Sequence, residues 1–164
     1  MSDICIYISM EEYLAKWFIH EMGGSKPVHL KRGCAESDFL HFNLKRLAEG
    51  EIPETAWNVK AKEGQVIVPI IIPSFTGLPA ATYNVLRPKA KAALVEIIRS
   101  RFKVELWTYM ERFEHLHVEQ KSLLYAWMET NGIPSQYWDS VMKILHRQRD
   151  NYRRRLKRRR SKKS

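Results

Sequence analysis

The pattern of hydrophobic and polar positions divides the chain into a mixed first half and a helical second half. Residues 4–8 read Ile-Cys-Ile-Tyr-Ile, and residues 66–72 are β-branched almost throughout, so both segments are predicted to be strands. Residues 27–31 are a third strand candidate. Because Pro69 cannot donate a ladder hydrogen bond, the strand at 66–72 is expected at a sheet edge or with a bulge.

Two helices are expected among these strands. Residues 10–22 carry apolar side chains near helical spacing, and the Gly-Gly pair at 23–24 stops this helix. Residues 35–47 place apolar side chains on one helical face. The segments 48–64 and 74–87 are rich in turn residues and lack a clear period, so they are expected to be loops, the second of them a loop or hinge.

The second half predicts three helices. Pro88 suits the first turn of a helix that continues for about seven turns to Phe113. Another runs over 118–130 and ends at the Asn-Gly pair at 131–132. Ser135 is placed to cap the last helix. The expected apolar faces of the long and the last helix are Ala92, Ala93, Ile97, Phe102, Leu106, Met110 and Phe113, and Trp138, Val141, Leu145, Tyr152 and Leu156.

The predicted fold class is therefore α+β. The N-terminal half has about three short strands and two helices, and the C-terminal half is helical, with a helix-turn-helix-like hairpin and a basic helical end. The predicted divisions are a mixed part at 1–86, a helical part at 87–156 and a disordered basic tail at 157–164, with everything before the tail forming one compact unit.

Charge is segregated along the chain. Residues 143–164 hold 12 of the 28 Lys and Arg and one acid, Asp150, a formal charge of +11 in a protein of net charge +10. The rest of the chain is nearly neutral. A cationic arm of this kind repels itself, and a polyanion relieves the repulsion, which makes nucleic acid the expected partner.

Other composition features exclude several classes. The longest apolar run, 66–73, is far shorter than the roughly 20 residues of a membrane span, and no signal-peptide pattern opens the chain, so a cytoplasmic protein with no membrane partner is expected. Cys5 and Cys34 are expected to be small buried thiols, and the spacing of cysteines and histidines supplies no zinc finger. No phosphate-binding glycine motif is present, and no cofactor is expected.

The segment 121–151 has helix-turn-helix proportions, although an ordinary helical hairpin has the same features. In such a unit the second helix enters the major groove. Gln136 would be a base contact. The expected phosphate contacts are Lys143, Arg147, Arg149, Arg153, Arg154, Arg155, Lys157, Arg158, Arg159 and Arg160. The alternative for the basic run is a solvated tail or a localisation signal.

Three alternatives belong to other classes. His115 and His117, flanked by Glu114 and Glu119, are candidates for a metal-dependent hydrolase, although two imidazoles two residues apart diverge on a helix. Cys34 follows two basic residues near a helix start and is a candidate nucleophile without an assignable histidine partner. In the third alternative, Trp57, Phe75, Leu78 and Tyr83 form a protein interface or stack on unpaired bases.

The chain resembles small uncharacterised proteins of Bacteroides-type prophages and mobile elements in three sequence segments, 6–17, 83–89 and 147–153. The resemblance implies a bacterial cytoplasm, where compact DNA-binding regulators are frequent, and brings no catalytic residue.

The sequence as a whole therefore predicts a non-enzymatic DNA-binding protein, either sequence-nonspecific or a regulator of transcription. DNA is favoured over RNA or single-stranded nucleic acid, and a palindromic target would imply a homodimer.

Overall fold

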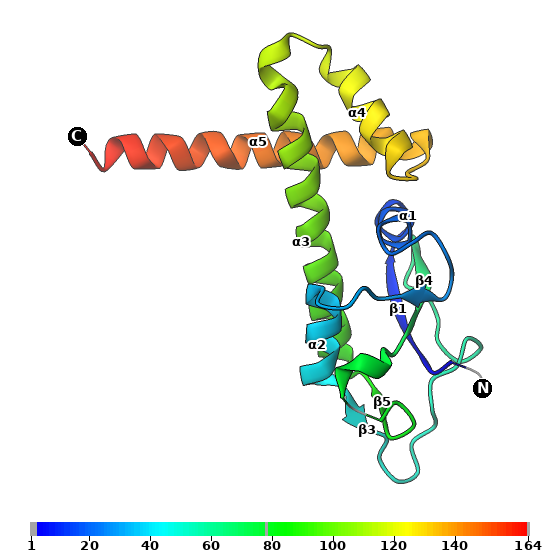
Figure 1. The fold of residues 1–164 in the computed structure, drawn as a ribbon. Coiled ribbons are helices and arrows are strands. Elements are labelled where there is room, and N and C mark those ends of the chain that lie inside the picture. The colour runs from blue at the N-terminus through cyan, green and yellow to red at the C-terminus, as the bar shows by residue number, and fades with distance from the viewer. Residues whose placement is uncertain (1–2, 78, 164) are drawn as a thin grey trace. The chain divides into compact units, whose positions relative to one another are not determined.

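The computed structural model describes residues 3–77 and 79–163, with the side chain of Thr76 also outside the description. The fold class is α+β, as predicted: strands and helices share the first half, and helices make up the second (Figure 1). The chain divides into two compact units, Met1–Ser100 and Arg101–Ser164. The boundary lies inside a helix, whereas the sequence indicated one compact unit with an internal division at residue 86. No described helix has the length and apolar character needed to cross a membrane.

A three-stranded sheet forms the centre of the first unit. Strand β1 (Cys5–Glu11) pairs antiparallel with β4 (Gln65–Ile71), and β2 (Val28–His29) pairs parallel with the other edge of β4. All three coincide with predicted strands. Alternate residues of β1 and β4 are buried, and Ile6 lies opposite Ile70 across the ladder. This period of two is the expected signature of a sheet with one face against the core.

The edge position predicted for the strand at 66–72 is wrong, because β4 is the middle strand. The physical reason is the shortness of β2, which pairs only with Ile70 and Ile71. At Pro69 the strand has a partner on one side only, where Tyr7 lies opposite. A proline can occupy this position because no ladder hydrogen bond is required on its second side.

Helices α1 (Glu12–Glu21) and α2 (Ala35–Asn43) fall where two helices were predicted, although α2 ends four residues early. Helix α1 packs on β1 and β4 and buries Trp17 and Phe18 completely. A second sheet, absent from the prediction, pairs β3 (Lys45–Arg46) with β5 (Tyr83–Val85), and a short 3-10 helix, η1 (Ser74–Thr76), precedes β5. Among their described residues, the predicted loops at 48–64 and 74–87 thus contain β5 and η1 as their only regular elements.

Helix α3 (Pro88–Phe113) has the predicted bounds, and Phe102, Leu106 and Met110 of its predicted apolar face are buried. Ala92 and Ala93 are exposed. The helix gives Leu94, Val95 and Ile98 to the core of the first unit, and Phe102, Leu106 and Met110 to the core of the second. Buried positions therefore recur every four residues along α3.

Two ion pairs join the 48–64 loop to the start of α3. Glu51 accepts a hydrogen bond from Arg87 at 2.6 Å, and Lys91 pairs with Glu54 at 2.5 Å. The Arg87 hydrogen bond, together with one from the backbone N–H of Ala48, holds the pKa of Glu51 below its ordinary value. The same pairing raises the pKa of Arg87.

We expect the Glu51 pair to stabilise the fold only where the carboxylate is ionised. A lowered folded-state pKa contributes stability above the unfolded-state value, near 4.3, and this contribution is lost as pH falls through the folded-state value. Thermal unfolding of Glu51→Gln should therefore show a lower Tm than the parent at pH 7, and the Tm difference should shrink as the pH falls below about 4.3. Glu49→Gln, at an exposed position two residues away, is the matched control. A Tm difference that persists unchanged at pH 3 would contradict the assignment.

Candidate nucleic-acid interface

The second unit contains the C-terminal half of α3, α4 (Gln120–Thr130) and α5 (Trp138–Ser161), with the short 3-10 helix η3 (Ser135–Tyr137) before α5. The ring of Phe102 meets that of Trp127 edge to face at 5.4 Å between centroids. Tyr125 stacks on Trp138 at 5.6 Å. These aromatic contacts fix α4 against α3 and against the first turn of α5.

The link between α4 and α5 is tightly specified. The N–H of Ile133 donates to the carbonyl of Met128 at 2.9 Å, and the N–H of Gly132 donates to that of Glu129 at 3.3 Å. Gly132 has φ of 69°, the left-handed conformation that glycine adopts most readily. This is a Schellman motif, and the buried side chains of Ile133 and Met128 accompany it. The predicted stop at 131–132 is confirmed.

The start of α5 differs from the prediction. Ser135 lies in η3, and neither η3 nor α5 has a side-chain capping hydrogen bond, so Ser135 does not cap α5. Gln136 is exposed but also belongs to η3, before the first residue of α5. Two helices joined by this short link fit both a helix-turn-helix and an ordinary hairpin, and the choice between them stays a prediction.

One side of α5 holds it to the rest of the unit. Val141 and Leu145 are fully buried, and the Gln148 side chain donates to the carbonyl of Lys103 at 2.8 Å. Tyr152, which the sequence assigned to the core, contacts Trp107 at 5.6 Å but is 49% exposed. Beyond Leu145 no described residue of α5 is buried.

The predicted disordered tail at 157–164 is corrected by the structure, because α5 continues as a helix through Ser161, and Ser164 lies outside the described residues. In Figure 1 the red turns of α5 extend past α4 and past the part of α3 that belongs to this unit. The last turn contains Arg158, Arg159 and Arg160, and cations at a helix C-terminus interact favourably with the helix dipole.

Four of the predicted phosphate contacts share one face of α5. Lys143, Arg147, Arg154 and Arg158 are separated by four, seven and four residues, which places them within about 60° of one another around the helix axis. We call these four side chains the outer face. It lies opposite the buried Val141 and Leu145, and all four side chains are exposed. Within the described part of the chain, none of the four forms an ion pair.

The other predicted contacts lie elsewhere on α5. Arg149 and Arg153 line a pocket of about 210 Å³ between α3 and α5, together with Trp107, Met110, Glu111, Glu114, Leu145 and Tyr152. Arg155 lines a neighbouring groove with Gln148 and Tyr152. Lys157, Arg159 and Arg160 are exposed on the last turns, where basic side chains surround the helix.

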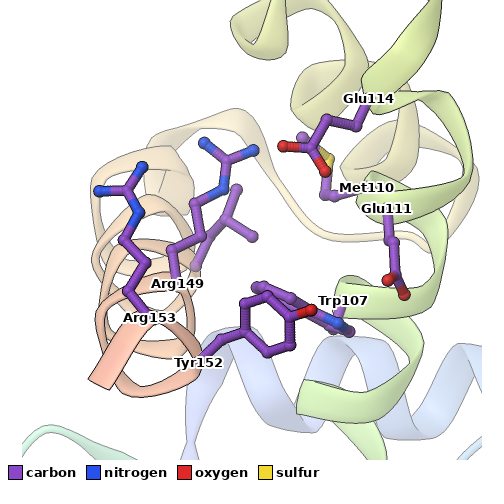
Figure 2. A pocket seen from close by; sticks show the side chains of 8 residues that line it. Trp107, Met110, Glu111, Glu114, Arg149, Tyr152 and Arg153 are labelled. Carbon is purple, nitrogen blue, oxygen red and sulfur yellow. The ribbon is translucent and has the colours of Figure 1, made fainter. Parts of the chain in front are cut away.

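Figure 2 shows how the pocket is built. Arg149 and Arg153 project from α5, Glu111 projects from α3, and Glu114 projects from the position directly after α3. The rings of Trp107 and Tyr152 lie together at one end. The guanidinium of Arg149 points toward the carboxylate of Glu114. No ion pair within 4.0 Å joins the two charged walls in the described residues.

Sequence reasoning missed the α3 wall of this pocket. Tyr152 was assigned to the core, and Trp107, Glu111 and Glu114 were not connected with it. The spacing of residues 107, 111 and 114, which share a helix face, was the available indication.

The metal-site alternative finds little geometric support. His115 lies in the short 3-10 helix η2 (Glu114–Leu116), and His117, with φ of 53°, follows it. Among the residues that the structure describes, no cluster of three or more His, Cys, Asp or Glu side chains could hold a metal ion.

The cysteines are free and half-buried, not buried as predicted. Cys34 stands at the N-cap of α2, which agrees with its predicted place near a helix start. Burial, and secondarily the charge of Asp3, raises the pKa of the Cys5 thiol.

The aromatic residues proposed as a protein or base-stacking interface belong to three different segments of the chain. Trp57 is 94% exposed in its loop, and Phe75 is 40% exposed in η1. Tyr83 lies in β5 beneath the guanidinium of Arg46, 5.0 Å from its ring centroid. Leu78 lies outside the described residues.

Comparison of the chain with protein-family models, curated proteins and solved structures gives no significant match. The resemblance to prophage proteins therefore stays a prediction, and the interface has to be argued from its geometry.

Residues 157–163 are exposed. We therefore expect the free energy of unfolding of a chain that ends at Leu156 to lie within about 0.5 kcal/mol of that of the full chain. A chain that ends at Lys143 lacks Leu145, whose buried side chain is worth about 2–5 kcal/mol, and should be severely destabilised. Urea unfolding followed by circular dichroism measures both. If the chain that ends at Leu156 lost more than about 2 kcal/mol of unfolding free energy, the last turns of α5 would have to be part of the packed core.

Proposed function

We propose that the protein binds nucleic acid, with duplex DNA favoured, through phosphate contacts made by the outer face of α5. The observation that carries the proposal is the orientation of this face. Val141 and Leu145 fix the rotation of α5 about its own axis, so Lys143, Arg147 and Arg154 are held toward solvent. Guanidinium groups match phosphate oxygens with several donors, and each neutralised phosphate releases counterions.

The dimensions of α5 favour duplex DNA over duplex RNA. The outer face extends for about 22 Å along the helix, at 1.5 Å per residue from Lys143 to Arg158. A helix is about 10–12 Å wide with side chains and fits the major groove of B-DNA, about 12 Å wide. The major groove of A-form RNA is too narrow for side chains to read. Phosphate contacts made by the outer face give affinity without sequence preference. Gln136 is the candidate residue for a contact with a base.

Among the described residues, His115 and His117 are not part of a cluster of three or more His, Cys, Asp or Glu side chains that could hold a metal ion. A binding role requires only the exposed cations that α5 carries. We therefore propose that the protein acts without catalysis, as a sequence-nonspecific DNA binder or a regulator.

The proposal is tested by the salt dependence of binding. About six phosphate contacts predict a log-log slope near −5 for a 20-base-pair duplex. Replacing the four outer-face cations, in Lys143→Gln/Arg147→Gln/Arg154→Gln/Arg158→Gln, should make the slope shallower by about 3.6. Fluorescence anisotropy between about 50 and 200 mM salt gives both slopes.

The matched control for this variant is Lys26→Gln/Lys31→Gln/Arg32→Gln/Lys60→Gln, which removes the same charge from exposed positions of the first unit. Its slope should stay near that of the parent. Equal losses in the two variants would mean that net charge, and not the outer face, determines binding. A parent slope near zero would rule out the proposal altogether.

A further inference from the structure

We propose that the pocket between α3 and α5 receives one unpaired nucleotide of the bound nucleic acid, and that the protein therefore prefers duplexes with a single-stranded extension. This inference rests on the proposed function, since the outer face of α5 would bring the strand to the pocket. It adds a second, distinct contact made by the inner side of the same helix.

The size of the pocket favours a single planar group. Its volume of about 210 Å³ is below the range of about 300–1,000 Å³ that is typical of sites for drug-sized molecules. The rings of Trp107 and Tyr152 meet at 49°, and Tyr152 remains 49% exposed. An aromatic ring open on one side offers a stacking platform, and stacking is worth about 1–3 kcal/mol per base.

The charges of the two walls orient such a nucleotide. Arg149 and Arg153, on α5, suit a phosphate group. Glu111, on α3, and Glu114, directly after α3, repel it. Carboxylates accept hydrogen bonds from exocyclic amino groups such as N4 of cytosine. The base would therefore face α3 and the phosphate would face α5. Thymine has no exocyclic amino group and presents carbonyl oxygens instead, so it should fit less well.

The arrangement on α5 connects the pocket with the outer face. Arg153 and Arg154 are adjacent in sequence and about 100° apart around the helix, and Lys157 lies between these directions one turn later. Cationic side chains thus continue from the outer face around α5 to the rim of the pocket. A free metabolite is too small to contact both the outer face and the pocket, whereas a nucleic-acid strand can contact both.

The experiment uses the full chain and three DNA probes with the same duplex: blunt, with a three-nucleotide dC extension, and with a three-nucleotide dT extension. We expect the dC extension to bind about tenfold more tightly than the blunt duplex, and about fivefold more tightly than the dT extension, which carries the same charge. Tryptophan fluorescence, to which Trp107 contributes, should be quenched by the dC probe. Cytidine monophosphate at the same concentration should leave it unchanged, and quenching by it would contradict delivery by a bound strand.

Tyr152→Ala should abolish the advantage of the dC extension and leave the affinity for the blunt duplex unchanged, whereas Tyr152→Phe should keep the advantage. Glu111→Gln/Glu114→Gln should remove the discrimination between dC and dT, which tests the pocket without truncating a ring. Equal binding of blunt and extended probes, or an advantage that survives Tyr152→Ala, would overturn the pocket inference alone. Failure of all three probes to bind would overturn the proposed function and this inference with it.

Discussion

Repulsion between like charges along α5 is the main constraint on the second unit, because the packing of this unit has to hold a self-repelling helix in place. Arg149 and Arg153, Arg154 and Arg158, and Arg155 and Arg159 each lie four residues apart, where a like-charged pair destabilises a helix by about 0.2–0.5 kcal/mol. Only Val141 and Leu145 are buried on this helix. The packed first turns therefore hold in place a longer cationic extension that contributes little packing of its own, and a polyanion along the extension would relieve the repulsion.

The same anchoring gives α5 two functional sides. The Schellman motif at Gly132 and the stacked Tyr125 and Trp138 fix where α5 begins, and the buried Leu145 fixes its rotation. The outer face is the consequence on the solvent side. On the inner side, α5 and α3 carry opposite charges around the rings of Trp107 and Tyr152 without closing the space between them. Phosphate contact and base stacking could thus be divided between two sides of a single helix.

Much of this architecture could be predicted from periodicity and charge. The three strands of the main sheet and the bounds of α3 follow from local patterns that the structure confirms. The middle position of β4 could not be predicted from local patterns, because it depends on long-range pairing with β2, which is only two residues long. Only the first half of the buried row of α3 was misassigned, because Ala92 and Ala93 were counted as core, although the larger Leu94 and Ile98 gain more from burial. All four residues of the outer face were among the predicted phosphate contacts. The pocket could not be predicted, because its walls come from α3 and α5, which are separated in the sequence by the whole of α4.

Hydrogen exchange with and without duplex DNA tests the central claim most directly. In the free protein, amides of residues 146–161 should exchange much faster than those of β4, since this part of α5 has no buried side chain to protect it. Addition of a 20-base-pair duplex at about 50 mM salt should slow exchange in 143–161 and leave β4 unchanged. Identical exchange of 143–161 with and without DNA, or protection confined to the first unit, would contradict the claim that α5 is the surface that meets nucleic acid.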